Sequence, residues 1–278
     1  MTFKTLVTGL SFGEGPRWRD GHLYYSDFYR HVVERVDVEG NVEQVAHVPN
    51  QPSGLGWLPD GRLLIVSMLD RKLLRLESNG ELSEHASLES VAAWHCNDMV
   101  VDTFGRAYVG NFGFDRAQSK PKAADLACVD PDGTVSCAAG GFKFPNGSVI
   151  TPDGETLVVG ETMGKQLTAF DIGPDGSLSN RRVWADLGEH YPDGICLDEA
   201  GGIWVTDPVG AVVVRVEEGG NITDTLDPGR SVFACMLGGA DRKRLFICTA
   251  STSGPEVVDL RDGKIEYADV DISGAGLP

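Results

Sequence analysis

The sequence predicts an all-β protein, a six-bladed β-propeller with four-stranded blades around a central channel. The first observation is a repeat, because six segments each read as an apolar strand, a tight turn and a second apolar strand. The second is the period, since the turns recur every 40 to 49 residues, a spacing typical of propeller blades. The third is composition: 35 glycines suit a chain with many turns, and no segment shows sustained helical periodicity.

The six paired-strand segments follow one another along most of the chain. They cover residues 14–27, 53–67, 97–111, 144–162, 193–207 and 234–249, and their turn positions are Gly21, Gly61, Gly105, Gly154, Gly201 and Arg242. Further strand-like runs lie between them and make four strands per blade plausible, as at residues 32–38, 72–76, 167–170 and 212–216. A β-sandwich is the alternative, but nothing in a sandwich requires a repeat of this length.

Both ends of the chain remain available to close the ring, because the repeats span about residues 11 to 260. Segments 5–8 and 264–267 read as strands that could both join the last sheet. Such closure is expected because an open ring leaves unpaired strand edges. We therefore expect residues 1–278 to form a single domain, and the protein to be a monomer or a weak homodimer.

Charge and cysteine usage exclude several classes of protein. The formal net charge is −17, which argues against nucleic-acid binding because phosphate recognition needs a basic face. No run approaches 18 apolar residues and no signal peptide is recognisable at the N-terminus, so we expect no membrane association. The six cysteines form no Cys-x-x-Cys pair. We expect them to be buried free thiols in a cytoplasmic protein.

Residues at the same place in each repeat should form a ring around the channel axis. Counting back eight positions from each turn gives the candidates Gly13, Ser53, Asn97, Asn146, Asp193 and Ala234. Glu14 lies only seven positions before its turn, and a slip of one residue points a side chain to the opposite face. Glu14 can therefore face the axis only if the first hairpin is one residue shorter than the others.

With that allowance, two carboxylates and two amides converge at one end of the channel: Glu14, Asn97, Asn146 and Asp193. Their oxygens are hard donors that suit one divalent metal ion, Ca²⁺, Mg²⁺ or Mn²⁺, and can also hold Zn²⁺. The alternative for each residue alone is a cap at the start of a strand. Four such residues in register favour a metal site.

Several motifs together resemble the SMP-30/gluconolactonase/luciferin-regenerating-enzyme family over nearly the whole chain. They are Phe12-Gly-Glu-Gly-Pro-Arg-Trp18, Cys96-Asn-Asp98, Pro145-Asn-Gly147 with Thr151-Pro-Asp-Gly154, and Tyr191-Pro-Asp-Gly194 with Gly202-Ile-Trp-Val205. The resemblance implies a six-bladed propeller with one catalytic divalent metal, held by Glu14, Asn146 and Asp193. It also implies that Asn97 contacts metal or substrate, and that Asp193 activates water.

One position departs from the family pattern. Sugar-lactonase members usually carry Arg two residues before the channel Asn, and here that residue is His95. A ring nitrogen replaces a fixed guanidinium fork, which suggests a different, more apolar lactone or ester. The alternative is that His95 only packs against Trp94. Phe112 and Phe114 follow a strand end and could wall a substrate pocket or pack within a blade.

These expectations define a metal-dependent lactonase that opens a cyclic ester, of a sugar or another small molecule, to a hydroxy acid. Asp193 or His95 would take the proton of the attacking water, and Asn97 would assist. No Gly-x-Ser-x-Gly motif supports a serine hydrolase. The alternatives are a metal-stabilised propeller that only binds ligands or proteins, and a metal-free propeller resembling strictosidine synthase, which the axial carboxylates disfavour.

Overall fold

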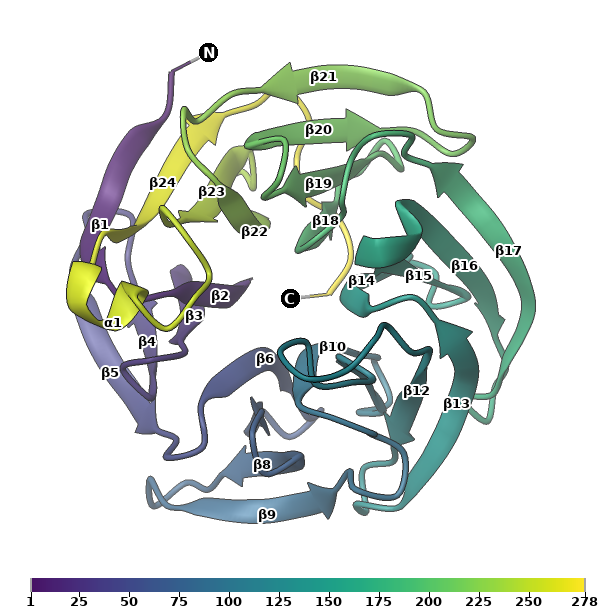
Figure 1. Cartoon of the computed structure of the whole chain (residues 1–278). Coiled ribbons are helices and arrows are strands. Elements are labelled where there is room, and N and C mark those ends of the chain that lie inside the picture. Colours follow the sequence, from purple (N-terminus) through teal and green to yellow (C-terminus); the bar gives the residue numbers. More distant parts are fainter. Residues whose placement is uncertain (1, 278) are drawn as a thin grey trace.

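The computed structural model describes residues 2–277 and shows six four-stranded antiparallel sheets arranged as blades around a channel (Figure 1). The predicted fold is therefore confirmed. In each blade the first strand along the repeat lies beside the channel and the fourth lies at the periphery (Figure 1).

The first three blades follow the chain in order. Blade 1 comprises β2 (Gly13–Arg19), β3 (His22–Asp27), β4 (Val32–Val36) and β5 (Val42–His47). Blade 2 comprises β6 (Pro52–Trp57), β7 (Leu63–Ser67), β8 (Lys72–Leu76) and β9 (Leu82–Ser87). Blade 3 comprises β10 (Cys96–Val101), β11 (Ala107–Asn111), β12 (Ala124–Val129) and β13 (Val135–Phe142).

The remaining blades complete the circle. Blade 4 comprises β14 (Pro145–Ile150), β15 (Thr156–Glu161), β16 (Gln166–Ile172) and β17 (Leu178–Asp186). Blade 5 comprises β18 (Ile195–Leu197), β19 (Ile203–Asp207), β20 (Val212–Val216) and β21 (Ile222–Leu226). Blade 6 comprises β22 (Val232–Gly238), β23 (Arg244–Thr249), β24 (Gly263–Asp269) and β1 (Lys4–Leu10). The described helices are short: a 3-10 turn at Thr162–Gly164 and α1 (Val257–Leu260).

Blade 6 closes the ring with strands from both ends of the chain, as the sequence predicts. β1 pairs antiparallel with β24, so that Lys4 lies opposite Tyr267 and Leu10 opposite Gly263. The last described residues then return to the channel, where Ala275 N donates to Leu197 O at 2.9 Å. Gly274 N also donates to Arg242 O at 2.8 Å, so this tail packs against the turn ends of blades 5 and 6.

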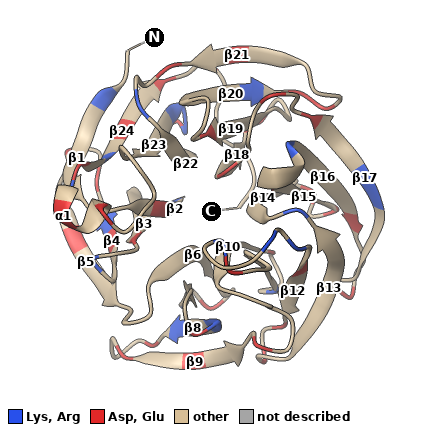
Figure 2. Ribbon diagram, in the orientation of Figure 1, with Lys and Arg blue, Asp and Glu red and all other residues tan. Residues whose placement is uncertain are grey.

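The apolar core lies between neighbouring blades. One cluster joins Leu64 and Val66 of blade 2 to Met99 and Val109 of blade 3, all buried. Charged side chains occupy mainly outer strands and turns around the whole ring (Figure 2), so the acidity is spread over the molecule. Among residues 2–277 no helix is long and apolar enough to cross a membrane.

The cysteine prediction needs one correction. All six cysteines are free thiols, and five of them are buried. Cys137 is exposed because it lies on β13, the outermost strand of blade 3. A fourth strand has a solvent face, so alternate side chains on it point to water.

Inner strands approach one another closely at the axis, and glycine permits this contact. Gly147 N on β14 donates to Asp193 O at 3.1 Å. A Cβ atom added at Gly147 would lie 2.7 Å from the same carbonyl oxygen, which is closer than van der Waals contact allows. The position of the backbone at Asp193 thus depends on the absence of a side chain in the neighbouring blade.

We expect Gly147→Ala to destabilise the protein by about 1–3 kcal/mol, because overpacking forces backbone shifts. Urea unfolding monitored by tryptophan fluorescence measures the change. Gly160→Ala on the adjacent strand is the matched control, since its Cβ would meet nothing closer than 3.4 Å. Equal stability of the two variants would contradict the proposed close approach.

Candidate functional site

A shared irregularity in the inner strands sets the ring of axial residues. In blades 1, 3 and 4 the pairing of the first two strands shifts by one residue just after the start of the inner strand. In each of these blades, one residue of the inner strand pairs with the last residue of the second strand. Glu14, Asn97 and Asn146 come immediately after that residue. They therefore occupy equivalent positions, and such a bulge can re-aim a side chain.

Glu14 reaches this ring for the reason anticipated from the sequence. The first hairpin turns through only Asp20 and Gly21, with φ of 49° and 78°, the left-handed values of a two-residue hairpin turn. In blade 2 the corresponding loop contains three residues, 59–61, because Leu58 N bonds to Arg62 O at 2.9 Å. The first hairpin is therefore one residue shorter.

The ring position of blade 6 differs from the sequence expectation. Counting from the turn selects Ala234, but Ala234 is buried in the core cluster, and Phe233 lines the channel cavity instead. The first pair of strands in blade 6 extends further, from Val232 to Gly238, so counting back from the turn gives the wrong position. An aromatic ring thus occupies this position.

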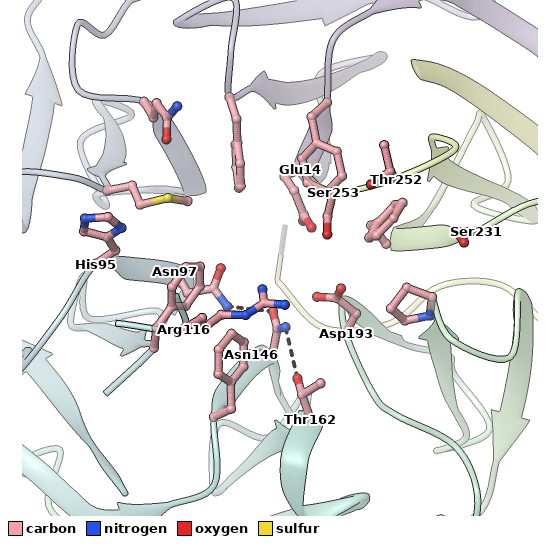
Figure 3. A pocket seen from close by; sticks show the side chains of 18 of the residues that line it. Glu14, His95, Asn97, Arg116, Asn146, Thr162, Asp193, Ser231, Thr252 and Ser253 are labelled. Atoms are coloured by element: carbon pink, nitrogen blue, oxygen red, sulfur yellow. Dashed lines mark hydrogen bonds between the residues drawn. The ribbon is translucent and has the colours of Figure 1, made fainter. Parts of the chain in front are cut away.

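The axial residues form the base of a cavity of about 530 Å³ at one end of the channel (Figure 3). Glu14, Asn97, Asn146 and Asp193 all line it. Asp193 lies just before β18, where its N–H donates to Thr206 O at 2.9 Å. The predicted convergence of these four side chains in one cavity is therefore observed.

A chain of hydrogen bonds orients the two amides. Asn97 Nδ2 donates to Asn146 Oδ1 at 2.9 Å, and Asn146 Nδ2 donates to Thr162 Oγ1 at 3.2 Å. The Thr162 hydroxyl donates in turn to Pro192 O at 2.6 Å. Because an amide oxygen has two lone pairs, Asn146 Oδ1 retains the capacity for one more partner.

The two carboxyl groups lie in an environment that disfavours their charge. Burial raises the pKa of Glu14 well above its usual value, and the nearby charges of Asp193 and Asp98 raise it further. Burial also raises the pKa of Asp193 to about 7, although the Asn146 amide opposes the shift. A bound cation would relieve this repulsion, and the oxygen donors present suit one.

The side chains around the site supply little positive charge to neutralise the Glu14 and Asp193 carboxylates. The buried Arg17 is engaged with Asp98 at 2.8 Å between blades 1 and 3. Across residues 2–277 no group of three or more His, Cys, Asp or Glu side chains is placed to hold a metal ion. Amide oxygens would therefore have to complete a site built on Glu14 and Asp193, which fits a hard cation better than a soft one.

His95 lines the cavity and also stacks on Trp94, with ring centroids 4.6 Å apart. His95 therefore packs on Trp94, as the alternative interpretation expected, and it also borders the cavity in which a substrate contact was predicted. Burial lowers the pKa of His95, so its ring is neutral near pH 7. It lies on the wall away from Glu14 and Asp193 (Figure 3).

Of the two aromatic residues predicted to wall a pocket, only Phe112 does so. Phe112 lines the cavity and stacks on Phe144 with centroids 4.8 Å apart. Phe114 is 5% exposed and lies outside the cavity wall. Gly113 between them has φ of +74°, and this turn separates the directions of the two side chains.

Sequence reasoning missed Arg116, Thr162 and most of the apolar wall. Arg116 lies in the loop between β11 and β12, and its guanidinium group points into the cavity beside Asn97 and Asn146 (Figure 3). Its central carbon lies 5.7 Å from the centre of the Phe144 ring. The direction of a loop side chain cannot be predicted from a strand register. The only sequence signal for Arg116 was the presence of a basic residue directly after the Phe112–Asp115 motif.

Comparison with known proteins agrees with this fold. A family model described as the SMP-30/Gluconolactonase/LRE-like region matches residues 12–251. The protein thus belongs to the SMP-30/gluconolactonase/LRE-like family, as its motifs predicted.

Individual relatives match most of the chain. Pentonolactonase XacC of Haloferax volcanii is 28% identical over 261 residues, covering 91% of this chain and 87% of the relative. The 6-deoxy-6-sulfogluconolactonase of Pseudomonas putida is 25% identical over 290 residues, covering 100% and 98%. A solved structure of a calcium-binding protein, regucalcin, from Agrobacterium tumefaciens shares the fold with a TM-score of 0.83 at 22% identity, covering 99% and 95%.

We expect the metal-free protein to lose stability as pH rises from about 4 to about 7. The folded chain keeps a proton on Asp193 up to a pKa of about 7, whereas the unfolded chain releases it near about 3.9. The contribution of one such group is at most about 1.4 kcal/mol per pH unit. Urea unfolding at several pH values measures it.

Asp193→Asn removes the contribution of Asp193 and should reduce the pH dependence over that range, leaving the part that the buried Glu14 contributes. Glu39→Gln, at an exposed turn, is the control and should keep the wild-type dependence. Parallel curves for wild type and Asp193→Asn would show that Asp193 is not the titrating group.

Proposed function

We propose that this protein is a divalent-metal-dependent hydrolase that opens a lactone to a hydroxy acid. The observation that carries the proposal is the convergence of Glu14, Asn146 and Asp193 with Asn97 at the base of one cavity. The names of the relatives support the reaction, because two of them are lactonases that match nearly the whole chain.

The residues that would hold the metal are Glu14, Asn146 and Asp193. Two buried carboxylates with raised pKa values gain most from a cation, because it favours their ionised forms. When bound, the cation would polarise the lactone carbonyl and stabilise the negative charge that develops on its oxygen. Calcium, magnesium, manganese and zinc all suit these donors.

Asp193 is the proposed general base. A carboxylate has two oxygens, so Asp193 can accept a proton from water while it also contributes to the metal site. The water oxygen would form a bond to the carbonyl carbon, and the ester bond from that carbon to the ring oxygen would then break. The proton held by Asp193 would pass to the released ring oxygen, leaving a hydroxy acid.

Asn97 and His95 are proposed to bind and orient the lactone. The Asn97 amide is held by its bond to Asn146, so its remaining polar atoms have a fixed direction toward the cavity. His95 lies away from the two carboxylates (Figure 3), and its neutral ring can donate or accept one hydrogen bond. We therefore assign it to positioning the substrate rather than to proton transfer.

The proposed cellular setting is the reducing cytoplasm, with a small molecule as the partner. All six cysteines are free thiols, and Cys196 and Cys235 remain unbonded with their sulfur atoms 3.6 Å apart. Disulfides persist mainly in oxidising compartments, so this pairing of free thiols fits a reducing one.

We expect EDTA to abolish lactone hydrolysis, and refilling with one of Ca²⁺, Mg²⁺, Mn²⁺ or Zn²⁺ to restore it. The carbonyl would lose its Lewis acid when the metal is removed. A pH-indicator assay on a lactone panel measures turnover, and circular dichroism of the EDTA-treated protein controls for unfolding. Full turnover in the folded, metal-free protein would refute the metal requirement.

Asp193→Asn should lower kcat by at least about a hundredfold, because a proton acceptor and an anionic metal ligand are both lost. Asp153→Asn makes the same chemical change in the turn at the far end of β14 and should leave kcat unchanged. Calorimetry with Ca²⁺ tests the ligand role independently. If Asp193→Asn binds metal and turns over normally, the assignment of Asp193 is wrong.

A further inference from the structure

We infer that the lactone opened by this site carries an apolar substituent, an alkyl chain or an aromatic ring, beside its lactone ring. The inference rests on the proposed function and narrows its substrate class. Three features of the same cavity support it: an apolar wall, a stacked aromatic pair and an exposed apolar rim.

The wall is built by four apolar side chains from blades 1, 2 and 6. Phe12, Phe28, Met68 and Phe233 line the cavity, and each is at most 8% exposed. The Phe12 ring centroid lies 4.7 Å from that of Phe233 and 5.3 Å from that of Phe28. The three rings offer no hydrogen-bonding atom, and the Met68 sulfur is only a weak acceptor.

The stacked pair Phe112 and Phe144 adds a second apolar surface from blades 3 and 4. Their rings are nearly parallel, with an interplanar angle of 16° and centroids 4.8 Å apart. Arg116 lies over Phe144 at 5.7 Å. A flat aromatic substituent can pack against such faces, and a guanidinium group can cover it.

The cavity rim exposes three further apolar residues. Leu69, Met163 and Val209 line the cavity while remaining 38%, 41% and 70% exposed. These residues come from blades 2, 4 and 5, and exposed apolar side chains that line a pocket can contribute to a binding surface. A substituent that extends from the lactone ring would cover them and remove their apolar surface from water.

A hydroxyl-rich lactone fits the apolar wall of this cavity poorly, although the cavity is also lined by Gln51, Ser231 and Ser253. Hydroxyl groups facing the wall would lose hydrogen bonds to water without a replacement partner. The Tyr29 hydroxyl donates to Ser253 O at 3.1 Å and the Thr252 hydroxyl donates to Glu256 Oε1 at 2.8 Å, so both could only accept a hydrogen bond from a substrate. The space of about 530 Å³ is typical of small-molecule sites and leaves room beyond the lactone ring.

The test compares kcat/KM for four δ-lactones with the same metal loaded. These are δ-valerolactone, the alkyl-substituted δ-decalactone, the aryl-fused dihydrocoumarin and the polyhydroxylated glucono-δ-lactone. We expect both apolar lactones to exceed glucono-δ-lactone by about tenfold or more, since each buried methylene contributes severalfold. Calorimetric binding of the corresponding lactams, which resist hydrolysis, gives a second readout.

Variants at the cavity rim test whether the exposed rim residues cause the preference for apolar lactones, and they leave the buried core unchanged. Leu69→Ser combined with Val209→Ser should lower kcat/KM for δ-decalactone by about fivefold or more, and by a clearly smaller factor for δ-valerolactone, which has no substituent to cover the rim. Val183→Ser is the matched control, because Val183 is 59% exposed on the outer strand β17. An equal loss with both lactones would overturn the assignment of the rim.

The outcomes distinguish this inference from the proposed function. Opening of glucono-δ-lactone as fast as, or faster than, the apolar lactones would overturn the apolar preference and leave a lactonase in place. If no lactone is opened with any metal, the proposed function fails. The lactam measurements then decide the preference alone, and equal binding of apolar and hydroxylated lactams would overturn it.

Discussion

The burial of two like-charged groups, Glu14 and Asp193, is the electrostatic constraint on which the site depends. Among residues 2–277 neither carboxylate forms an ion pair like that of Arg17 with Asp98 at 2.8 Å, although the charge of Arg116 opposes the rise in the pKa of Asp193. Each must therefore bind a proton or share a cation to avoid the cost of an uncompensated buried charge. The raised pKa of Asp193, about 7, expresses this in the metal-free protein. A proton and the proposed metal ion would therefore compete for the same carboxylate oxygens.

The propeller makes this crowding possible because its inner strands meet at the axis. One-residue shifts in strand pairing place Glu14, Asn97 and Asn146 equivalently in their blades, and Gly147 lets blade 4 approach the backbone at Asp193. The donors come from four blades that are far apart in sequence. Their mutual positions are therefore held by blade packing rather than by a flexible loop.

The cavity divides into a polar base and apolar walls, and these parts have different origins. The base consists of inner-strand residues that repeat with the blades, whereas the walls are largely strand ends and connections, such as Phe28, Met68 and Arg116. The base follows the repeat of the blades, whereas the walls do not, so the walls can change without altering the base. Function resides in such sites carried by a fold rather than in the fold itself.

The sequence by itself determined the propeller, the blade boundaries, the closure by both chain ends and the four axial oxygen donors. Each follows from a periodic pattern in the sequence, because the strand register places residues that repeat with the blades at equivalent positions in the fold. Only the tertiary structure decided that Phe233 replaces Ala234 in the ring, that Phe114 turns away, and that Arg116 points into the cavity. These depend on strand extension, on the backbone at Gly113 and on a loop path, none of which repeats from blade to blade.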